Sequence, residues 1–518
     1  MLTDEKRKSL PIEKLKYFVV NTILTTMTFI KRINRGKYTY LAEVKSVRVG
    51  TKVKHEFIRY VGKEVDNKTI LSGSIERSKI TSVTVYGPLL VLHNIAESLG
   101  LPTIFGEIAP YILSLVYAHC VEPGSLASVE KWYSRTDLKH ILGLESVTYD
   151  KLLKALDFLD GREKEIQKSL FCAAQDLLNL APEGVFYDVT NVYFYGSECE
   201  IAKKGHNKEG KSCDQIQIGL AVTKDEKIPI FHKVFEGNIH DAKTIRHFFD
   251  DFDTEIRAWI VWDRGVTSRE NIADALKAKF HVLCGVPLKG NVTQLVDETL
   301  QTNNIAQYEN RVVLTKTTLY ARQLKYTYEN IPGYLTICFN ESERVAQKER
   351  RFRRIYEAIS DKKEIPSSIK KYIKYGVINK QAVEEAEKHD GISLIFSTKR
   401  LPVEETLYAY FEKDKVEKAF QSLKKTLEIR PIRHWLTDRV KSHVFICYMA
   451  YYLLSILEYR LRPLKLTAPA ALDQLKTLYR VNIVDPKTKN IFSKVVSLTS
   501  TQEKILKTIN KKLLKCSQ

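Results

Sequence analysis

The stretch "GVFYDVTNVYFYG", residues 184–196, decides the expected fold because it sets a carboxylate inside an apolar and aromatic run. Its β-branched and aromatic residues are typical of a strand, and Asp188 interrupts them. An unpaired carboxylate is costly in such surroundings, so a cation or hydrogen-bond donors are expected beside Asp188. A structural ion pair would satisfy this aspartate as well as a functional site would. The stretch therefore predicts a largely buried strand with a carboxylate of undecided role.

The next segments predict a hairpin and then alternating helices and strands. "QIQIGLAVT" (215–223) and "IPIFHKVFEG" (228–237) flank the turn "KDEK" and indicate two further strands. Asp241 can cap a helix that runs to about residue 256, and "AWIVW" (258–262) is a buried strand. The predicted order up to this point is three strands, a helix and a strand.

A second helix and strand complete the pattern. Thr267 and Glu270 have the spacing of a capping box for a helix to about residue 279, and "HVLCGV" (281–286) is the next strand. The resulting order, β-β-β-α-β-α-β, resembles that of the RNase H-like fold. We therefore expect an α/β fold: an RNase H-like catalytic core with a mixed, β-rich insertion, preceded by a small β module and a helical domain.

The rest of the chain divides into segments of different pattern. Residues 29–63 hold ten Lys or Arg against two Glu among β-forming residues, which indicates a basic β module or a solvated sheet face. The expected parts are a basic β-rich DNA-binding module at 1–85, a helical domain at 86–180, the first part of the core at 181–287, an inserted subdomain at 288–404, and a catalytic helix with a C-terminal helical region at 405–518. In the insertion, "GISLIFST" (391–398) is a strand that can rejoin the main sheet.

Composition narrows the class of protein. The chain has 518 residues, a formal charge of +20 and a pI near 9.3, which favours a polyanionic partner such as nucleic acid, although a merely soluble basic protein has the same balance. Eight scattered cysteines, without a CxxC motif or a signal peptide, indicate free thiols in the cytoplasm. The longest apolar run, 444–457, falls short of the roughly 20 residues that span a bilayer and predicts a buried helix without a membrane role.

A second stretch, "YFEKDKVEKAFQSLKK" (410–425), predicts a helix with a polar stripe. At about 100° per residue, the four residues of the stripe fall within a sector of about 60°. The apolar residues Val416, Ala419, Phe420, Leu423 and Leu427 flank it, and the stripe consists of Tyr410, Lys413, Glu417 and Lys424. Such charges on a helix commonly make surface ion pairs, so the stripe alone does not establish a site.

Asp263 strengthens the hypothesis that the stripe belongs to a functional site. It follows "WIVW" and precedes Arg264-Gly265, which sets it at the carboxyl end of a strand, where open α/β sheets build their sites; a turn aspartate is the alternative. Asp188, Asp263 and Glu417 together would provide the oxygen ligands that a two-magnesium phosphoryl-transfer site needs.

These residues resemble a known family. "YDVTNVYF", "WDRGV", "RPIRHW" and the spacing Tyr410-x2-Lys413-x3-Glu417-x6-Lys424 are similar to the DDE transposases of prokaryotic insertion sequences, in the branch with a Tyr-Arg-Glu-Lys signature. The resemblance implies that Asp188, Asp263 and Glu417 are catalytic residues that hold two Mg²⁺ or Mn²⁺ ions. It also implies DNA-phosphate contacts from Tyr410, Lys413 and Lys424, and Arg430 and Arg433 can extend that track.

Two departures from the family pattern matter. Lys413 stands where the family usually has arginine, which keeps the charge and loses the planar fork. The four tryptophans lie at 132, 259, 262 and 435, so the insertion offers no tryptophan on which a flipped base could stack in a hairpin intermediate.

The function that the resemblance implies is DNA transposition. The enzyme would bind the terminal repeats of its own element, cleave phosphodiester bonds, and join the 3′ ends to target DNA, as a homodimer on DNA in the nucleoid of the cytoplasm. The alternatives are a catalytically inactive or domesticated DNA-binding protein derived from a transposase, and a metal nuclease of the same fold.

Overall fold

The structure is a computed structural model that describes residues 28–516 with short gaps. The residues not described are 1–27, 37, 50–51, 66–67, 72–78, 195, 197, 206–212, 253–257, 303, 315–316, 361–365, 428, 485–488, 490 and 517–518. The chain forms two compact units. The N-terminal unit is Met1–Val83 with Val481–Lys494, and the main unit is Thr84–Arg480 with Val495–Gln518.

The N-terminal unit contains an antiparallel sheet in the order β1-β2-β3-β4. Its strands are β1 (Thr28–Arg35), β2 (Tyr38–Val49), β3 (Lys52–Val65) and β4 (Lys68–Leu71). The surface of this sheet exposes aromatic side chains among the basic ones: Tyr38, Phe57 and Tyr60 are all exposed, and Lys63 Nζ lies 5.2 Å from the centroid of the Tyr38 ring. A second, three-stranded sheet joins β5 (Lys79–Val85), β18 (Tyr479–Val484) and β19 (Ile491–Val495).

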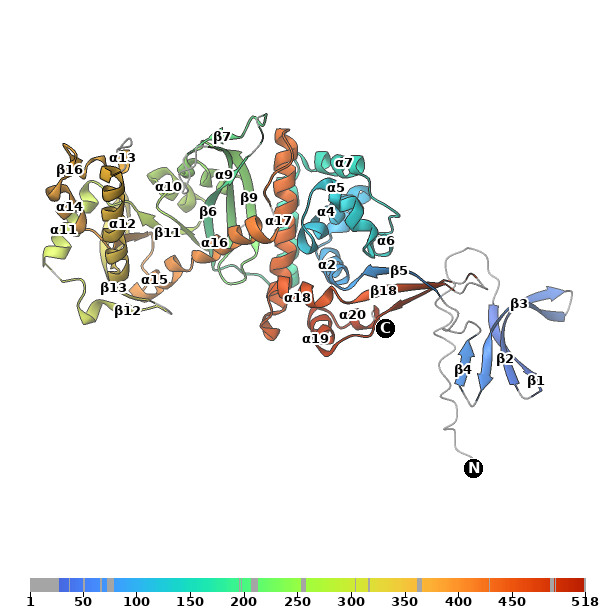
Figure 1. Ribbon diagram of the computed structural model, residues 1–518. Helices are drawn as coiled ribbons and strands as arrows, with labels where there is room; N and C mark the ends of the chain where they lie inside the picture. Colours follow the sequence, from blue (N-terminus) through green and yellow to red (C-terminus); the bar gives the residue numbers. More distant parts are fainter. Residues whose placement is uncertain are drawn as a thin grey trace, which may run out of the picture. The chain divides into compact units, whose positions relative to one another are not determined.

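The main unit begins with helices, most of which lie on one side of a long helix. They are α2 (Gly87–Ser98), α3 (Leu101–Phe105), α4 (Ala109–Val121), α5 (Leu126–Ser134), α6 (Leu138–Leu142), α7 (Tyr149–Leu159) and α8 (Glu163–Leu178). The long helix, α17 (Thr437–Arg460), contacts α2, α4 and α7 on one side and strand β9 (Pro229–Glu236) on the other. Figure 1 shows α17 standing between these helices and the central sheet. The small helices α18 (Ala468–Leu475), α19 (Ser500–Ile509) and α20 (Leu513–Cys516) follow it.

Helix α17 contains the apolar run of residues 444–457, and all of that run is buried. The prediction of a buried helix is therefore confirmed, although the helix itself has 24 residues and is longer than the run. Within the described residues, two segments, Leu101–Val121 and Thr437–Arg460, are long and apolar enough to cross a membrane, and 61% and 89% of their most apolar windows are buried inside the protein. A core helix passes the same test of length and composition.

A mixed ten-stranded sheet forms the centre of the main unit. Its order is β12-β13-β14-β17-β11-β10-β6-β8-β7, and β9 pairs with β8. The strands expected for the core are β6 (Gly184–Tyr193), β8 (Asp214–Thr223), β9, β10 (Trp259–Trp262) and β11 (His281–Val286), with helices α9 (Ile245–Asp251) and α10 (Arg269–Lys277) between them. The predicted β-β-β-α-β-α-β order is present, with the two-residue strand β7 (Lys203–Lys204) added after β6.

Alternate residues of these strands enter two separate cores. Phe186 and Val261 belong to the core that also contains α16 and α17, whereas Tyr187 and Trp262 belong to a second core with Phe248 of α9. This follows from the two-residue period of a strand, which sends successive side chains to opposite faces of the sheet. We call the first side the α17 face and the second the α9 face.

The segment predicted as an insertion extends the same sheet. Strands β12 (Arg311–Val313), β13 (Thr318–Tyr328) and β14 (Ile331–Phe339) form a meander, and β17 (Ile392–Ser397) pairs with both β14 and β11. The expected return of residues 391–398 to the main sheet is thus confirmed. The helices of this segment are α11 (Asn291–Thr302), α12 (Glu341–Ser360), α13 (Ser367–Lys370) and α14 (Lys380–Glu387), with the small hairpin of β15 (Ile373–Lys374) and β16 (Val377–Ile378).

Two predicted helix caps are wrong. Asp241 begins a short 3-10 turn, and the cap is the His240 side chain, which accepts from the Ala242 N–H at 3.2 Å. Helix α10 is capped by Ser268, because the Thr267 hydroxyl is engaged with the Gly285 carbonyl at 2.7 Å. In both places the preceding or following residue, His240 or Ser268, is the N-cap instead.

Candidate functional site

Asp188 and Asp263 lie at the same level on neighbouring parallel strands. Strands β6 and β10 pair with each other, and Tyr187 lies opposite Trp262. Asp188 directly follows Tyr187, and Asp263 directly follows Trp262. Asp188 shares the strand period of Phe186, so its side chain projects to the α17 face. Strand order and register, set by the buried apolar residues, therefore bring two carboxylates from 75 residues apart to the same level of two central strands, β6 and β10.

The Asp263 carboxylate is held through one of its two oxygens. Oδ1 accepts hydrogen bonds from Lys413 Nζ at 2.8 Å, from the Arg264 backbone N–H at 2.9 Å and from the Tyr410 hydroxyl at 3.1 Å. Burial opposes ionisation of this half-exposed group, but the Lys413 charge and the three hydrogen bonds outweigh burial, and the pKa of Asp263 is lowered. The side chain is therefore an ionised carboxylate at neutral pH.

Tyr410 reaches Asp263 through a space that a glycine leaves open. Tyr410 is buried, and burial together with the Asp263 charge raises the pKa of its hydroxyl, so this group acts as a hydrogen-bond donor. A Cβ at Gly285 of β11 would collide with the Tyr410 hydroxyl and would also come within 3.1 Å of the Arg264 nitrogen. The sheet accommodates the tyrosine here because position 285 carries no side chain.

The helix predicted over 410–425 is not continuous. Helix α15 (Val403–Phe411) ends before a turn at Glu412 and Lys413, α16 (Asp414–Gln421) follows, and residues Ser422–Thr426 form a π-helical turn. Tyr410, before the turn, and Lys413, within it, bond the same oxygen of Asp263. The prediction of one regular helix is wrong, because helical periodicity alone does not show the turn at Glu412 and Lys413.

The four residues of the predicted stripe accordingly have different environments. Lys424 Nζ donates to the Thr190 hydroxyl at 2.7 Å, two residues beyond Asp188 on the same face of β6. Glu417 lies between Lys413 and Lys424 along the chain and is exposed, on a helix whose apolar side packs against β6 and β8. The α16 segment is thus attached to the sheet at Asp263 and at Thr190, with Glu417 between the two points.

The three predicted carboxylates do not form a compact ligand set. In the described part of the chain, one group of three or more His, Cys, Asp or Glu residues has its ligand atoms within 4.8 Å of one another, and it is His119, His443 and Cys447. Like charges repel unless a cation lies between them, and Lys413 supplies the positive charge beside Asp263. Cys199, His206 and Cys213 lie near one another in the sequence, with a spacing unlike that of known zinc sites, and His206 lies outside the described residues.

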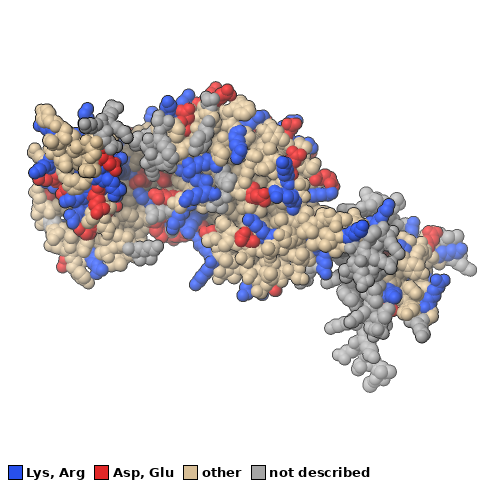
Figure 2. Space-filling view, viewed as in Figure 1, with Lys and Arg blue, Asp and Glu red and all other residues tan. Residues whose placement is uncertain are grey.

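The remaining predicted residues lie just after α16. The Arg430 guanidinium is 5.8 Å from the centroid of the Tyr193 ring, at the end of β6, and Arg433 is exposed beside His434 and His443. Lys418 and Lys425 of this segment are also exposed. Figure 2 shows Lys and Arg side chains gathered over the region where Figure 1 labels α16.

Sequence reasoning missed Thr190, Gly285 and the buried histidines. Thr190 could have been found, since it follows Asp188 by one strand period. Gly285 and the pair His119 and His443 gain their roles only from the packing of distant elements, and no local pattern marks them.

Comparison with known proteins identifies the family to which the chain belongs. Residues 179–453, more than half of the chain, match the family described as "Transposase DDE domain". No curated protein matches the chain. A cryo-EM structure of a piggyBac transposase synaptic complex with hairpin DNA is similar over 76% of this chain and 80% of its own, at 11% identity and a TM-score of 0.37, which is too low to establish a shared fold. On the extent of the family match, the chain belongs to the family of transposase DDE domains.

Proposed function

We propose that this protein is a metal-dependent DNA transposase that binds the ends of its own element, cleaves phosphodiester bonds and joins the 3′ ends to target DNA. Membership of the transposase DDE family supports the class of protein. The observation that carries the proposed site is the register of Asp188 and Asp263 beneath the segment that holds Glu417. The strand order β9-β8-β6-β10-β11, with β10 and β11 parallel to β6, supports an RNase H-like core.

The donor set suits Mg²⁺ or Mn²⁺, which prefer oxygen ligands. All three donors to Asp263 use Oδ1, and no hydrogen bond to Oδ2 is made by the described residues. The lowered pKa keeps this half-exposed carboxylate ionised, as a metal ligand must be. Although their oxygens are not gathered within 4.8 Å of one another, we assign Asp188, Asp263 and Glu417 as the residues that would hold two ions, and bound ions would stabilise the attacking and leaving oxygens of an in-line displacement.

The side chains around the metal ligands have roles of their own. Lys413 and Tyr410 fix the Asp263 carboxylate by charge and by hydrogen bonding to Oδ1. Water attacks first and the freed 3′ hydroxyl attacks second, so the reaction needs no covalent enzyme intermediate. We assign Lys424, Arg430 and Arg433 to phosphate contacts, and Tyr410 and Lys413 to contacts made when DNA reaches Asp263.

The N-terminal unit is the second proposed DNA contact. Its sheet combines basic residues with the exposed aromatic rings of Tyr38, Phe57 and Tyr60, a combination that binds phosphates and stacks on bases. We further propose that two copies assemble on paired element ends in the nucleoid of the cytoplasm.

Cleavage of a plasmid that carries the DNA flanking the gene tests the proposal. The natural protein and Glu417→Gln are compared with Mg²⁺ and with Mn²⁺, and binding to the same ends is measured for both. Cutting by the natural protein alone, with equal binding, supports a catalytic Glu417. Binding without cutting by either protein would favour an inactive DNA-binding derivative, and cutting without joining would favour a nuclease.

A further inference from the structure

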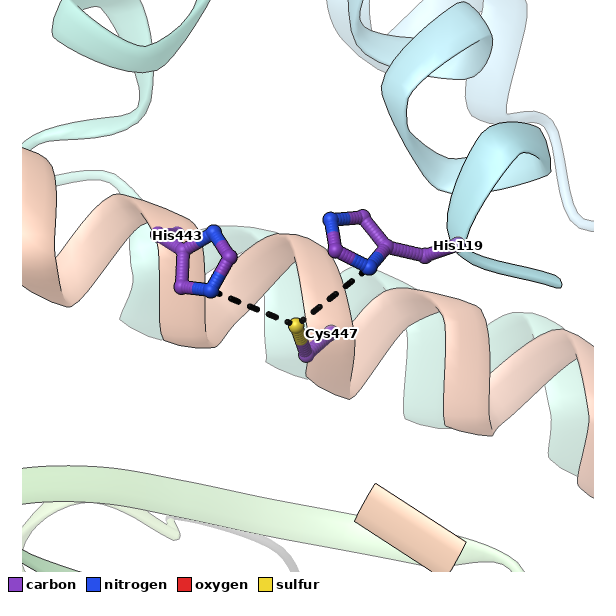
Figure 3. Close-up of side chains that lie close together, drawn as sticks. All are labelled: His119, His443 and Cys447. Atoms are coloured by element: carbon purple, nitrogen blue, oxygen red, sulfur yellow. Dashed lines mark hydrogen bonds between the residues drawn. The ribbon is translucent and has the colours of Figure 1, made fainter. Parts of the chain in front are cut away.

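A cluster of two histidines and a cysteine is buried away from the carboxylates. His119 comes from α4, and His443 and Cys447 come from consecutive turns of α17 (Figure 3). Cys447 Sγ lies 3.9 Å from His119 Nδ1 and 3.9 Å from His443 Nε2. All three residues are buried, so their polar atoms need partners inside the protein.

Those partners are two backbone carbonyls. His119 Nδ1 is 2.9 Å from the Leu427 oxygen, and His443 Nε2 is 3.2 Å from the Ile429 oxygen. A carbonyl can only accept, so each of these nitrogens carries the proton of its ring. They are also the nitrogens that face the Cys447 sulfur, and a protonated nitrogen has no lone pair for a metal ion.

The protonation states of His443 and Cys447 agree with a hydrogen-bonding role rather than a metal-binding one. Burial, with smaller contributions from the nearby His119, His434 and Arg433, lowers the pKa of His443 to about 3, so the ring is neutral and has a single N–H. Burial raises the pKa of the Cys447 thiol, which opposes the thiolate form that metals bind. In a metal site, the ring nitrogen that bonds a carbonyl is the one opposite the metal, which is not the arrangement here.

The two carbonyls lie where α16 and its π turn end. The Leu427 N–H bonds the Ser422 carbonyl and the Ile429 N–H bonds the Leu423 carbonyl, both at 3.1 Å. The last carbonyls of a helix find no N–H donor within the helix itself. Leu427 and Ile429 are also buried. The histidines supply the donors that water cannot supply at this depth.

We propose that His119 and His443 form a clamp that fixes the end of the α16 segment and thereby positions Glu417 and Lys424, and that the cluster is not a metal site. We call these two residues the histidine clamp. Their role in positioning rests on the proposed function, whereas their role in ordering residues 414–430 does not.

Matched substitutions in the full-length protein test the clamp. His119→Asn and His443→Gln each keep an N–H near the place of the donating nitrogen, whereas His119→Leu and His443→Leu remove the donor. We expect Leu variants to bind element-end DNA as the natural protein does and to cut it on the order of tenfold to a hundredfold more slowly. The Asn and Gln variants should recover most of that rate. Equal rates for the Leu variants and the natural protein would overturn the positioning role.

The metal alternative gives a different pattern. Cys447→Ala should cut at the rate of the natural protein if the clamp acts through hydrogen bonds, because the sulfur is not one of the donors. Stoichiometric zinc in the purified protein, lost together with activity in Cys447→Ala, His119→Asn and His443→Gln, would replace the clamp with a metal site.

Hydrogen–deuterium exchange separates failure of the clamp from failure of the proposed function. The amides of residues 416–429 should exchange faster in the Leu variants than in the natural protein, the Asn and Gln variants staying close to the natural rate. This holds even if the natural protein does not cut DNA. Unchanged exchange in both Leu variants would overturn the clamp itself.

Discussion

The segment from Tyr410 to Ile429 is held to the rest of the protein at two ends by opposite kinds of chemistry. At the first end, which we call the aspartate anchor, Lys413 and Tyr410 bond a half-exposed, ionised Asp263. At the second end, two buried histidines bond backbone carbonyls, and His443 is neutral. An ionised, accessible carboxylate can exchange its partners for a metal ion or for phosphate-bound ions, whereas buried donors cannot. This difference is why we propose that the first end serves chemistry and the second serves position.

Removal of the charge at the aspartate anchor should have the largest effect. In Asp263→Asn the side chain can still accept the three hydrogen bonds, but it loses the negative charge that a divalent ion requires. We expect cleavage to fall by at least about 10³-fold with DNA binding retained. Gel analysis of end cleavage with Mg²⁺ measures this.

Asp438→Asn is the matched control, because Asp438 is an exposed aspartate at the start of α17 with a 3.8 Å contact to Lys441. It should cut at the natural rate. If Asp263→Asn also cuts at that rate, the aspartate anchor is structural and the contrast between the two ends disappears.

A methyl group at Gly285 should disturb the aspartate anchor without changing any charge. Its Cβ would collide with the Tyr410 hydroxyl, so Gly285→Ala should reduce the free energy of unfolding by about 1–3 kcal/mol and slow cleavage by roughly tenfold or more. Thermal unfolding and cleavage rates measure the two effects.

Adding Tyr410→Phe to Gly285→Ala removes the hydroxyl that the methyl group meets. The double variant should therefore lose less stability than the sum of the two single variants. Additive losses would mean that the methyl group acts elsewhere, for example on Arg264, whose nitrogen is also close.

The sequence predicted the parts of this arrangement that depend on local pattern. The period of apolar residues identifies strands β6, β8, β9, β10 and β11 in their order, and it sets Asp188 and Asp263 next to buried strand residues. The buried run in α17 is likewise visible as an unbroken apolar stretch.

Contacts between distant segments decided the rest. Helical periodicity gave Tyr410 and Lys413 one regular helix, yet their shared bond to Asp263 accompanies a turn between α15 and α16. The caps at Asp241 and Thr267 failed because His240 and Ser268 take those positions. No pattern near His119 shows that it meets Leu427, 308 residues later in the chain.

Acid should weaken the two ends in different ranges of pH. The pKa of His443 is lowered from 6.5 to about 3 in the folded state, so the unfolded chain binds a proton between these values and the folded protein does not. Stability is therefore lost as the pH falls from about 6.5 toward 3, by about 1–2 kcal/mol at pH 5. Asp263, with a lowered pKa, contributes stability above about pH 3.8 that is lost only below it.

Urea unfolding at pH 7 and pH 5 measures this difference. His443→Gln cannot take up the proton, so its loss of stability between these values should be smaller than that of the natural protein, and Asp263→Asn should lose as much as the natural protein does. An equal loss in all three proteins would show that His443 is not the acid-sensitive group of the clamp.

The hydrogen bond from Lys424 to Thr190, which lies between the two ends of the segment, should contribute least to stability and cleavage. Thr190→Val removes the hydroxyl that accepts from Lys424 and keeps the shape of the side chain, so the free energy of unfolding should fall by only about 0.5–1 kcal/mol. Thr190→Ser keeps the hydroxyl and should retain that energy, and urea unfolding of both variants measures it. Cleavage should change less in Thr190→Val than in Gly285→Ala, because both ends of the α16 segment remain held. A larger loss of cleavage in Thr190→Val would mean that Lys424, rather than either end, sets the position of Glu417.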